Sequence, residues 1–218
     1  MPTDSKLYVY LNPGRFIVDT TTSFDPRQFA GWVPHQHIAY LWPTAPWFWV
    51  FEQLGVPDWI AHRLWIGTLL VVGGLGVRWV SRVLGLAPLA ALVAALVYQL
   101  SPYVLPYISR TSVLLLPWAG LGWIVGLTVL AAQRGRWRFP AAIALVVLTV
   151  GAVNATALAM IIPAPTLWLA HAVWNRSITW RRALATAGKV AVLSTAVSLW
   201  WMAMLIIQGR RGGDVLAY

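Results

Sequence analysis

The sequence predicts an all-α fold, that of a polytopic helical membrane protein. Between Asp58 and Asp214 the chain of 218 residues has no Asp or Glu, and this tract is rich in Leu, Val, Ala, Trp and Gly. Because burying a carboxylate in lipid costs several kcal/mol, a long acid-free apolar tract is typical of helices that lie in the bilayer. The chain is also 59% hydrophobic with a mean hydropathy of +0.68, which is more apolar surface than one soluble core of this size can bury.

Charge and composition exclude several other classes. The net charge of +10 does not indicate nucleic-acid binding, because no basic run alternates with exposed polar sequence and the positive-inside rule explains the excess of Arg. The absence of Cys excludes disulfides and thiolate chemistry. The 15 Trp residues are expected mainly at membrane interfaces and helix contacts, with a minority lining a carbohydrate or lipid groove. The opening residues MPTDSKLY lack the apolar core of a signal peptide.

Residues 1–59 differ from the rest and are expected to form a periplasmic first loop with a juxtamembrane helix. They contain five of the six acidic residues and seven Pro, a composition typical of an ordered extramembrane loop. Within them the aromatic block Trp47-Phe48-Trp49-Val50-Phe51 predicts a short helix lying in the membrane interface. The alternative is that this block forms the core of a small soluble cap.

Six transmembrane helices are expected within residues 60–208. Their apolar stretches are separated by Arg-rich or Pro-containing turns, for example at Arg82, at Ser101-Pro102-Tyr103 and at Arg134. The expected spans are residues 60–80, 86–100, 112–132, 139–153, 157–174 and 184–207, and residues 209–218 are expected to begin a further periplasmic loop.

The region from Phe139 to Trp174 is too long for one span of about 20 residues and short for two. Arg-rich segments flank both of its ends, so an even number of crossings would return the chain to the same side. We therefore expect two short helices that turn near Asn154-Ala155-Thr156, with Pro163 and Pro165 kinking the second.

The distribution of charge predicts the orientation in the membrane. The loops expected after residues 80, 132 and 174, with their flanks, hold nine basic and no acidic residues, whereas the opposite side holds seven basic and six acidic residues. By the positive-inside rule the first group faces the cytoplasm and residues 1–59 face the periplasm. The cytoplasmic Arg residues are expected to set topology only. The alternative is a docking site for anionic lipid or for an acidic partner such as an acyl carrier protein.

Polar residues suited to a reaction with a phosphate leaving group lie on the expected outer face. A carboxylate there can take a proton from an acceptor hydroxyl, and Arg, Lys or His can neutralise a departing phosphate. The candidates are Asp4, Lys6, His35, Gln36, His37, Arg110, Arg210 and Arg211. From spacing alone, His35 and His37 could instead be a metal pair, although no third ligand has a regular spacing to them, and Asp4 could be an ordinary surface charge.

Short motifs in order along the chain resemble those of a known family. Asp4-Ser5-Lys6-Leu7 and Asn12-Pro13-Gly14-Arg15-Phe16 are similar to the D-[ST]-K-L…N-P-x-R-F opening of the first outer loop in actinobacterial arabinofuranosyltransferases of the AftD kind. The similarity continues through Gln36, Ala39-Tyr40-Leu41-Trp42-Pro43, Leu54-Gly55-Val56-Pro57, Arg63-Leu64-Trp65, Ala95, Leu100-Ser101-Pro102, Leu116-Pro117-Trp118-Ala119, Val153-Asn154-Ala155-Thr156-Ala157, Trp200-Trp201 and Gln208-Gly209-Arg210. Together these motifs cover nearly the whole chain.

The resemblance implies a GT-C glycosyltransferase with a Pro- and Trp-rich first outer loop. It implies inverting transfer of arabinofuranose from decaprenylphosphoryl-arabinofuranose to the arabinan of arabinogalactan and lipoarabinomannan. Asp4 occupies the motif position of the essential acid, which implies a general base. The residues expected to bind substrate and to steady the lipid phosphate are Lys6, His35, Gln36, His37, Arg110 and Arg210. A hydrophobic groove between helices would hold the prenyl tail, with the aromatic block at its mouth.

The resemblance also implies a place and partners for the protein. It is expected in the inner (plasma) membrane, with several passes and a periplasmic active face, in contact with the lipid donor, the arabinan acceptor and membrane lipids. No cofactor is expected, and a need for a divalent metal is left open. Family members begin with a further span and are several times longer, so we expect a truncated fragment that is inactive alone.

Three other functions stay open on the sequence. The chain could belong to a transferase that uses a different polyprenyl-phosphate sugar, such as a mannose donor. It could belong to a transporter of lipid-linked sugar, although the acid-free spans argue against proton coupling through carboxylates. It could also be an inactive or structural fragment.

Overall fold

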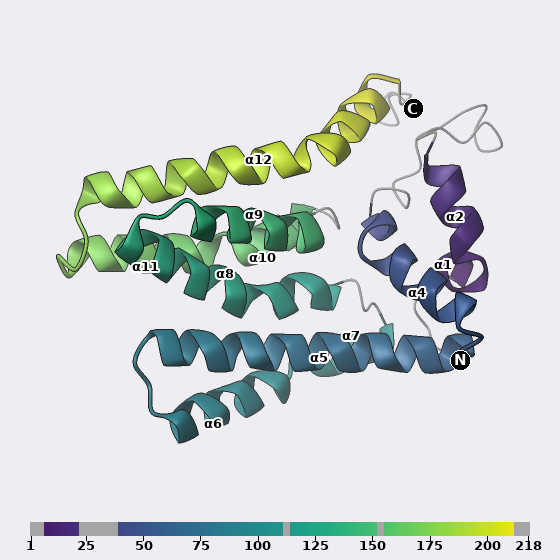
Figure 1. Cartoon of the computed structure of the whole chain (residues 1–218), viewed down its shortest axis with the longest axis horizontal. Coiled ribbons are helices and arrows are strands. Elements are labelled where there is room, and N and C mark those ends of the chain that lie inside the picture. The colour runs from purple at the N-terminus through teal and green to yellow at the C-terminus, as the bar shows by residue number, and fades with distance from the viewer. Residues whose placement is uncertain (1–6, 22–38, 111–113, 152–154, 212–218) are drawn as a thin grey trace, which may run out of the picture.

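The structure is a computed structural model that describes residues 7–21, 39–110, 114–151 and 155–211 (Figure 1). Across these ranges all regular secondary structure is helical, which confirms the predicted all-α class. The helices are α1 (Leu7–Leu11), α2 (Pro13–Thr20), α4 (Thr44–Gln53), α5 (Asp58–Val83), α6 (Pro88–Gln99), α7 (Val104–Arg110), α8 (Leu115–Arg134), α9 (Arg138–Val150), α10 (Ala155–Ile161), α11 (Pro163–Trp174) and α12 (Trp180–Arg211).

Several helices are long and apolar enough to cross a membrane. Four such segments lie in the described ranges, namely Asp58–Val83, Leu115–Arg134, Ala157–Trp174 and Trp180–Ile207. The helices α6 and α9 are apolar but shorter. They overlap the expected spans 86–100 and 139–153, whose passage through the bilayer stays a prediction.

Two helices extend beyond the ranges expected from the sequence at both ends. The first long helix, α5, begins at Asp58, where Pro57 precedes it as the N-cap residue. The last helix, α12, continues to Arg211, so Arg210 lies in its final turn. Residues 209–211, which the sequence assigned to a loop, are therefore helical, and the periplasmic side of that loop stays a prediction.

Figure 1 shows a bundle of helices, α5 to α12, with a small cap formed by α1, α2 and α4 at one end. The cap packs on the start of α5 through aromatic side chains. Tyr10 and Phe48 lie edge to face with ring centroids 4.4 Å apart, and Tyr10 meets the ring of His62 at 5.4 Å. Both Tyr10 and Phe48 are buried in the same hydrophobic cluster as Trp65 of α5. The cap and the bundle therefore share one core.

The bundle is centred on α8, which contacts α5 closely. A Cβ atom placed on Gly122 of α8 would lie 2.6 Å from the carbonyl carbon of Gly76 in α5, so the two backbones touch. Indole rings fill the space beside this contact. Trp118 lies on Gly73, Trp123 on Gly76 and Trp79 on Gly126, each closer to the glycine than any Cβ would allow. The pairing of small with very large residues lets the helices approach and still leaves a filled interface.

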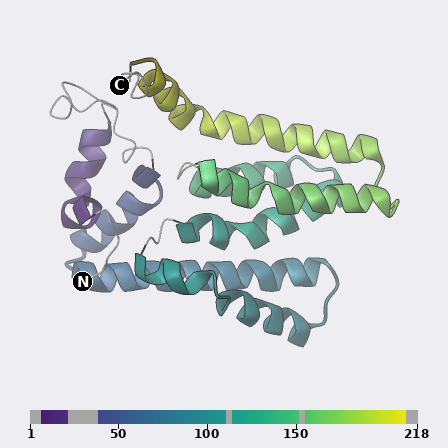
Figure 2. The same ribbon diagram turned by 180° about the vertical axis from the view of Figure 1, so that it is seen from behind.

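The connections between the helices lie at two ends of the bundle, and these ends differ in charge. Figures 1 and 2 show that the α5–α6, α8–α9 and α11–α12 connections lie at one end, and that the cap and the C-terminal end of α12 lie at the other. The first end carries Arg residues without an acid, because residues 59–213 contain no Asp or Glu. Which of the two ends faces the cytoplasm stays a prediction.

The backbone contact between α5 and α8 predicts an unequal response to one substitution at two glycines. Gly122→Ala would press a methyl group into the α5 backbone and should destabilise the protein by about 1–3 kcal/mol, as overpacking does. Gly188→Ala in α12 meets nothing within 4 Å and should be neutral or slightly stabilising. Thermal unfolding in detergent, followed by circular dichroism, measures both. Equal unfolding temperatures would contradict this account of the crossing.

Candidate functional site

The residues that the sequence predicts for the site are mostly outside the described ranges. This applies to Asp4, Lys6, His35, Gln36 and His37. Arg110 is the last residue of α7, and only its backbone is described. Arg210 is exposed in the last turn of α12, at the end of the bundle that carries the cap. Arg211 is the last residue of α12, and only its backbone is described. The roles expected for all eight residues stay predictions.

The residues that border the segments outside the described ranges lie in one place. Leu7 begins α1 immediately after Lys6, and Tyr10 in the next turn is 6% exposed. Ala39 and Tyr40, which follow the segment containing His35 and His37, are 4% and 3% exposed. Tyr10, Ala39 and Tyr40 belong to one hydrophobic cluster. The described residues that border the predicted acid and the predicted histidines therefore belong to the same core.

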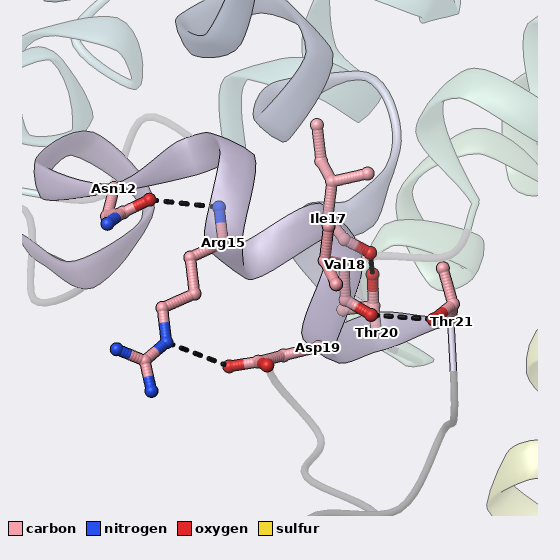
Figure 3. Close-up of polar contacts among 7 residues, drawn as sticks. All are labelled: Asn12, Arg15, Ile17, Val18, Asp19, Thr20 and Thr21. Carbon is pink, nitrogen blue, oxygen red and sulfur yellow. Dashed lines mark hydrogen bonds and ion pairs between the residues drawn. The ribbon is translucent and has the colours of Figure 1, made fainter.

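The motif Asn12-Pro13-Gly14-Arg15-Phe16 has a structural role that Figure 3 shows in part. Asn12 is the N-cap of α2, and its Oδ1 accepts a 2.9 Å hydrogen bond from the Arg15 backbone N–H. Pro13 occupies the first turn, where no backbone donor is needed. The Arg15 side chain reaches Asp19 one turn later at 3.7 Å, and Phe16 is buried in the core. The motif therefore starts and anchors a helix.

The described acids all belong to this end of the chain. They are Asp19 in α2, Glu52 in α4 and Asp58 at the start of α5. Asp19 is already engaged by Arg15, while Glu52 and Asp58 are exposed. No group of three His, Asp or Glu residues in the described ranges is placed to hold a metal ion. Among the described side chains, a carboxylate can reach a substrate only from the cap end.

The aromatic block predicted at the membrane interface forms most of α4. Trp47 donates its indole N–H to the Ala61 carbonyl over 3.1 Å, and its ring lies 5.4 Å from that of Trp65. Phe48 is 3% exposed, whereas Trp49 and Val50 are about half exposed at 43% and 45%. One face of α4 therefore joins the shared core while the other is free. Its position in a membrane interface stays a prediction.

A large apolar cavity lies beside the cap, between α5, α8 and α9. Its volume is about 410 Å³, within the range of small-molecule sites. Apart from the indole N–H groups of Trp65 and Trp123, Thr149 has the only polar side-chain atom among the lining residues. The lining residues are Pro43, Trp65, Leu69, Val72, Leu116, Ala119, Gly120, Trp123, Leu145, Val146, Thr149 and Val150. Leu145 is 62% and Val72 37% exposed, so the cavity opens on the side of the bundle.

The cap borders this cavity through the Trp42-Pro43 dipeptide. Pro43 is part of the lining, and Trp42 donates its indole N–H to Thr149 Oγ1 of α9 over 3.4 Å. Only four residues separate Trp42 from His37 along the chain. The cavity is therefore close in sequence, through Trp42 and Pro43, to the segment that carries the predicted histidines.

The connection between α6 and α7 adds a neutral donor at the same end. The Tyr103 hydroxyl lies 3.5 Å from Met160 Sδ in α10, and its ring lies 4.7 Å from that of Tyr107. Burial, and to a lesser extent the nearby Tyr107, raises the pKa of Tyr103 above its ordinary value. The phenol is thus protonated at neutral pH and serves as a hydrogen-bond donor.

Sequence reasoning predicted an apolar groove but not the residues that form it. Several lining residues do fall in motifs that carry the family resemblance, namely Pro43, Trp65, Leu116 and Ala119. The contribution of α9, from Leu145 to Val150, had no sequence signal apart from hydropathy. Whether a side chain of α9 faces lipid or a cavity depends on the rotation of that helix against α8.

Comparisons with known proteins agree on one family. The model of the family described as α-(1→3)-arabinofuranosyltransferase, N-terminal GT-C domain, matches residues 1–218. A relative named α-(1→3)-arabinofuranosyltransferase from Mycobacterium tuberculosis is 34% identical over 212 residues, which cover 93% of this chain and 14% of the relative. One with the same name from Mycolicibacterium smegmatis is 32% identical over 219 residues, 95% of this chain and 14% of the relative. The chain thus spans about one seventh of these relatives.

Solved structures are similar over the same extent. A cryo-EM structure of the arabinofuranosyltransferase AftD from mycobacteria superposes with a TM-score of 0.82 at 29% identity, covering 96% of this chain and 16% of that one. A structure of a mutant of AftD gives a TM-score of 0.80 at 29% identity, covering 96% and 17%. Together with the four long apolar helices, this likeness confirms the predicted fold of a helical membrane protein.

The capping role of Asn12 predicts a local effect on α2. Asn12→Ala removes the acceptor for the Arg15 N–H and should weaken the start of α2 by about 1 kcal/mol, which corresponds to about fivefold faster amide exchange there. Asn12→Asp keeps an acceptor oxygen and should exchange like the wild type. Hydrogen–deuterium exchange mass spectrometry of peptides from α2 makes the comparison. Fast exchange in the Asp variant would show that capping is not what Asn12 supplies.

Proposed function

Because the chain belongs to the α-(1→3)-arabinofuranosyltransferase family, as its N-terminal GT-C domain, we propose that it contributes to the transfer of arabinofuranose from decaprenylphosphoryl-arabinofuranose to cell-wall arabinan. The acceptors would be arabinogalactan and lipoarabinomannan. The relatives that carry this name are much longer than the chain, which covers 14% of them. The activity is therefore proposed for the protein in which this domain works, with this domain supplying the general base and part of the donor site.

The observation that carries the proposal is the apolar cavity beside the cap. A polyprenyl-phosphate sugar has a long apolar tail and a charged head, so its site needs an apolar space that ends at polar groups. The cavity between α5, α8 and α9 offers the first, and Trp42 and Pro43 connect it to the segment with His35 and His37. The opening past Leu145 and Val72 would admit the tail from the membrane. With a volume of about 410 Å³, the cavity would hold the isoprene units next to the phosphate.

The proposed chemistry uses one carboxylate. Asp4 takes the proton from a hydroxyl of the arabinan acceptor, and the oxygen of that hydroxyl attacks the anomeric carbon of the donor. The bond between that carbon and the phosphate oxygen breaks, and the bonding electrons leave with the lipid phosphate. The sugar passes through an oxocarbenium-like state and its configuration inverts. A direct displacement needs a single carboxylate on the acceptor side, which is consistent with the scarcity of acids in the chain.

The leaving phosphate needs positive charge or hydrogen-bond donors at the same end. Lys6, His35, His37, Arg110 and Arg210 are the candidates, and Gln36 would contact the donor or the acceptor. The placement of Arg210 in the last turn of α12, at the cap end, supports its inclusion. Arg110 ends α7, and α8 follows it closely in the chain. The first residues of α8, Leu115 and Leu116, are buried in the core that the cap and the bundle share.

The proposed setting is the inner membrane, with the cap and the cavity mouth on the periplasmic side. The positive-inside rule supports this orientation, because the connections rich in Arg lie together at the opposite end of the bundle. The acidic cytoplasmic partner considered from the sequence, such as an acyl carrier protein, would meet that opposite end and has no part in sugar transfer.

The assignment of the base predicts a selective loss of activity. In the full-length protein Asp4→Asn should lower sugar transfer by a factor of about 10²–10⁴, the usual contribution of a general base, and leave membrane insertion unchanged. Asp19→Asn is the matched control, since Asp19 belongs to the same part of the chain but pairs with Arg15. Transfer of radiolabelled arabinose from decaprenylphosphoryl-arabinofuranose in membranes measures both. Wild-type turnover by the Asp4→Asn variant would remove Asp4 from the mechanism.

The assignment of the cavity predicts an effect on donor binding. Val72→Trp places a large ring in the cavity and should raise the KM for the lipid donor about tenfold, with a smaller change in kcat. Val71→Trp is the control, because Val71 is 54% exposed and is not part of the lining. Initial rates at varied donor concentration give both constants. If the two variants have the same KM for the lipid donor, the tail lies elsewhere. A separate result, transfer from a mannose donor only, would reject arabinofuranose as the sugar.

A further inference from the structure

A basic surface lies at the end of the bundle away from the cap, and the proposed sugar transfer does not use it. The name basic surface is used for five residues, Arg134, Arg136, Arg138, Arg176 and Arg181. All five are exposed. The first three come from the α8–α9 connection and its flanks, and the other two from the α11–α12 connection and the start of α12. The nearest acids in the sequence, Asp58 and Asp214, are far along the chain in both directions.

Two further cations join the connections that form this surface. Arg182 donates from Nη2 to the Gln133 carbonyl, and Lys189 Nζ donates to the Gly135 carbonyl over 3.2 Å. Both acceptors lie at the C-terminal end of α8, where carbonyl groups have no partner within the helix. The Lys189 ammonium also lies 4.8 Å from the centre of the Trp137 ring. The start of α12 is thus tied to the α8–α9 connection, so the Arg residues of the two connections lie at neighbouring parts of the bundle end.

The backbone at Arg176 adds a second, independent observation. Arg176 has a φ of 58°, in the left-handed region that normally favours Gly or Asn. Its N–H donates to the Val173 carbonyl over 3.0 Å, and the Ser177 N–H donates to the Ala172 carbonyl over 3.0 Å, which ends α11. A long charged side chain therefore occupies a position where a glycine would cost less. A residue in the left-handed region is a common way for a helix to end, and here that residue adds a cation to the α11–α12 connection.

The surroundings of the basic surface are apolar and aromatic. Trp137, Trp174 and Trp180 flank it with exposures of 58%, 86% and 58%, as indoles do at the level of lipid headgroups. Exposed apolar side chains continue along the helices from the same point, with Leu167 in α11 at 69% and Leu184 in α12 at 61%. A ligand that fits must be anionic at one end and apolar along its length, which describes a phospholipid better than a free anion or a folded acidic protein.

We propose that the basic surface, with Trp137 and Trp180 at its edge, binds the phosphate of an anionic phospholipid whose acyl chains lie along α11 and α12. The positive-inside rule explains why Arg residues gather on one side of a membrane. It does not explain why two connections are tied together by Arg182 and Lys189. The proposal is independent of sugar transfer and of the residues proposed for it.

The chain itself offers a matched control for this site. Arg78 and Arg82 are exposed cations near the α5–α6 connection, at the same end of the bundle. Figures 1 and 2 show that this connection lies at the opposite edge of that end from the α11–α12 connection. Arg82 donates to the Leu86 carbonyl of its own connection. Removing these two charges changes the net charge of that end as much as removing two from the basic surface.

The test is native mass spectrometry of the purified chain in detergent, titrated with dioleoyl phosphatidylglycerol or dioleoyl phosphatidylcholine. The wild type should retain the anionic lipid at about tenfold lower concentration than the neutral one, because juxtamembrane cations attract anionic headgroups strongly. Arg136→Gln with Arg181→Gln should abolish most of this preference. Arg78→Gln with Arg82→Gln should keep it. Circular dichroism confirms that both double variants remain helical.

Each other outcome overturns the proposal. Equal losses in the two double variants would mean that total charge, not this site, attracts the lipid. Equal retention of both lipids by the wild type would mean that no headgroup is recognised. If inorganic phosphate displaces phosphatidylglycerol, the site takes a free anion. If a polyglutamate peptide binds the basic surface in phosphatidylcholine micelles and displaces phosphatidylglycerol, the surface docks an acidic protein instead.

Discussion

Where α5 crosses α8, glycine backbone lies against glycine backbone, and indole rings from each helix fill the space on either side. Gly76 and Gly122 bring the two chains together, while Trp118 and Trp123 pack over the glycines of α5. Trp123 also donates its indole N–H to the Val72 carbonyl over 3.0 Å, so its position is held by both packing and a hydrogen bond. In a membrane, where burial of apolar surface gives little driving force between helices, this close packing is what holds a bundle together.

The same crossing forms the wall of the cavity. Val72, Trp123 and Gly120 line it, and each is placed by the contact between α5 and α8 or between α8 and α9. The cap then closes one side through Pro43, and Trp42 bonds to Thr149. The apolar part of the candidate site is therefore a product of how the helices pack, and the polar part proposed for it would meet it through the cap. Packing and the proposed function are linked through a few side chains that would serve in both.

The bundle has two chemically different ends. The cap end holds every described acid and the buried residues that border the segments with the predicted base and histidines. The other end holds cations that no described acid pairs with, two of which instead bond to the carbonyl groups that end α8. Among the described residues a carboxylate is therefore available only at the cap end, while the other end is suited to anions. This division is consistent with a proposed reaction on one side of the membrane and lipid contacts on the other.

Hydropathy, the segregation of acids and the order of motifs were enough to predict an all-α membrane fold and its family, because each depends on residue type along the chain. The comparisons confirm both. Local patterns likewise predicted helices near the observed ranges, although hydropathy did not indicate that α5 begins at Asp58 or that α12 continues to Arg211. The functional roles proposed for Asp4 and His37 rest on the resemblance, and both residues lie outside the described ranges.

Only the tertiary structure decided which helix faces meet. The cavity lined by Trp65, Trp123 and Thr149, and the bond from Lys189 to Gly135, join residues distant in sequence, and their contact depends on helix rotation and crossing that no local pattern specifies.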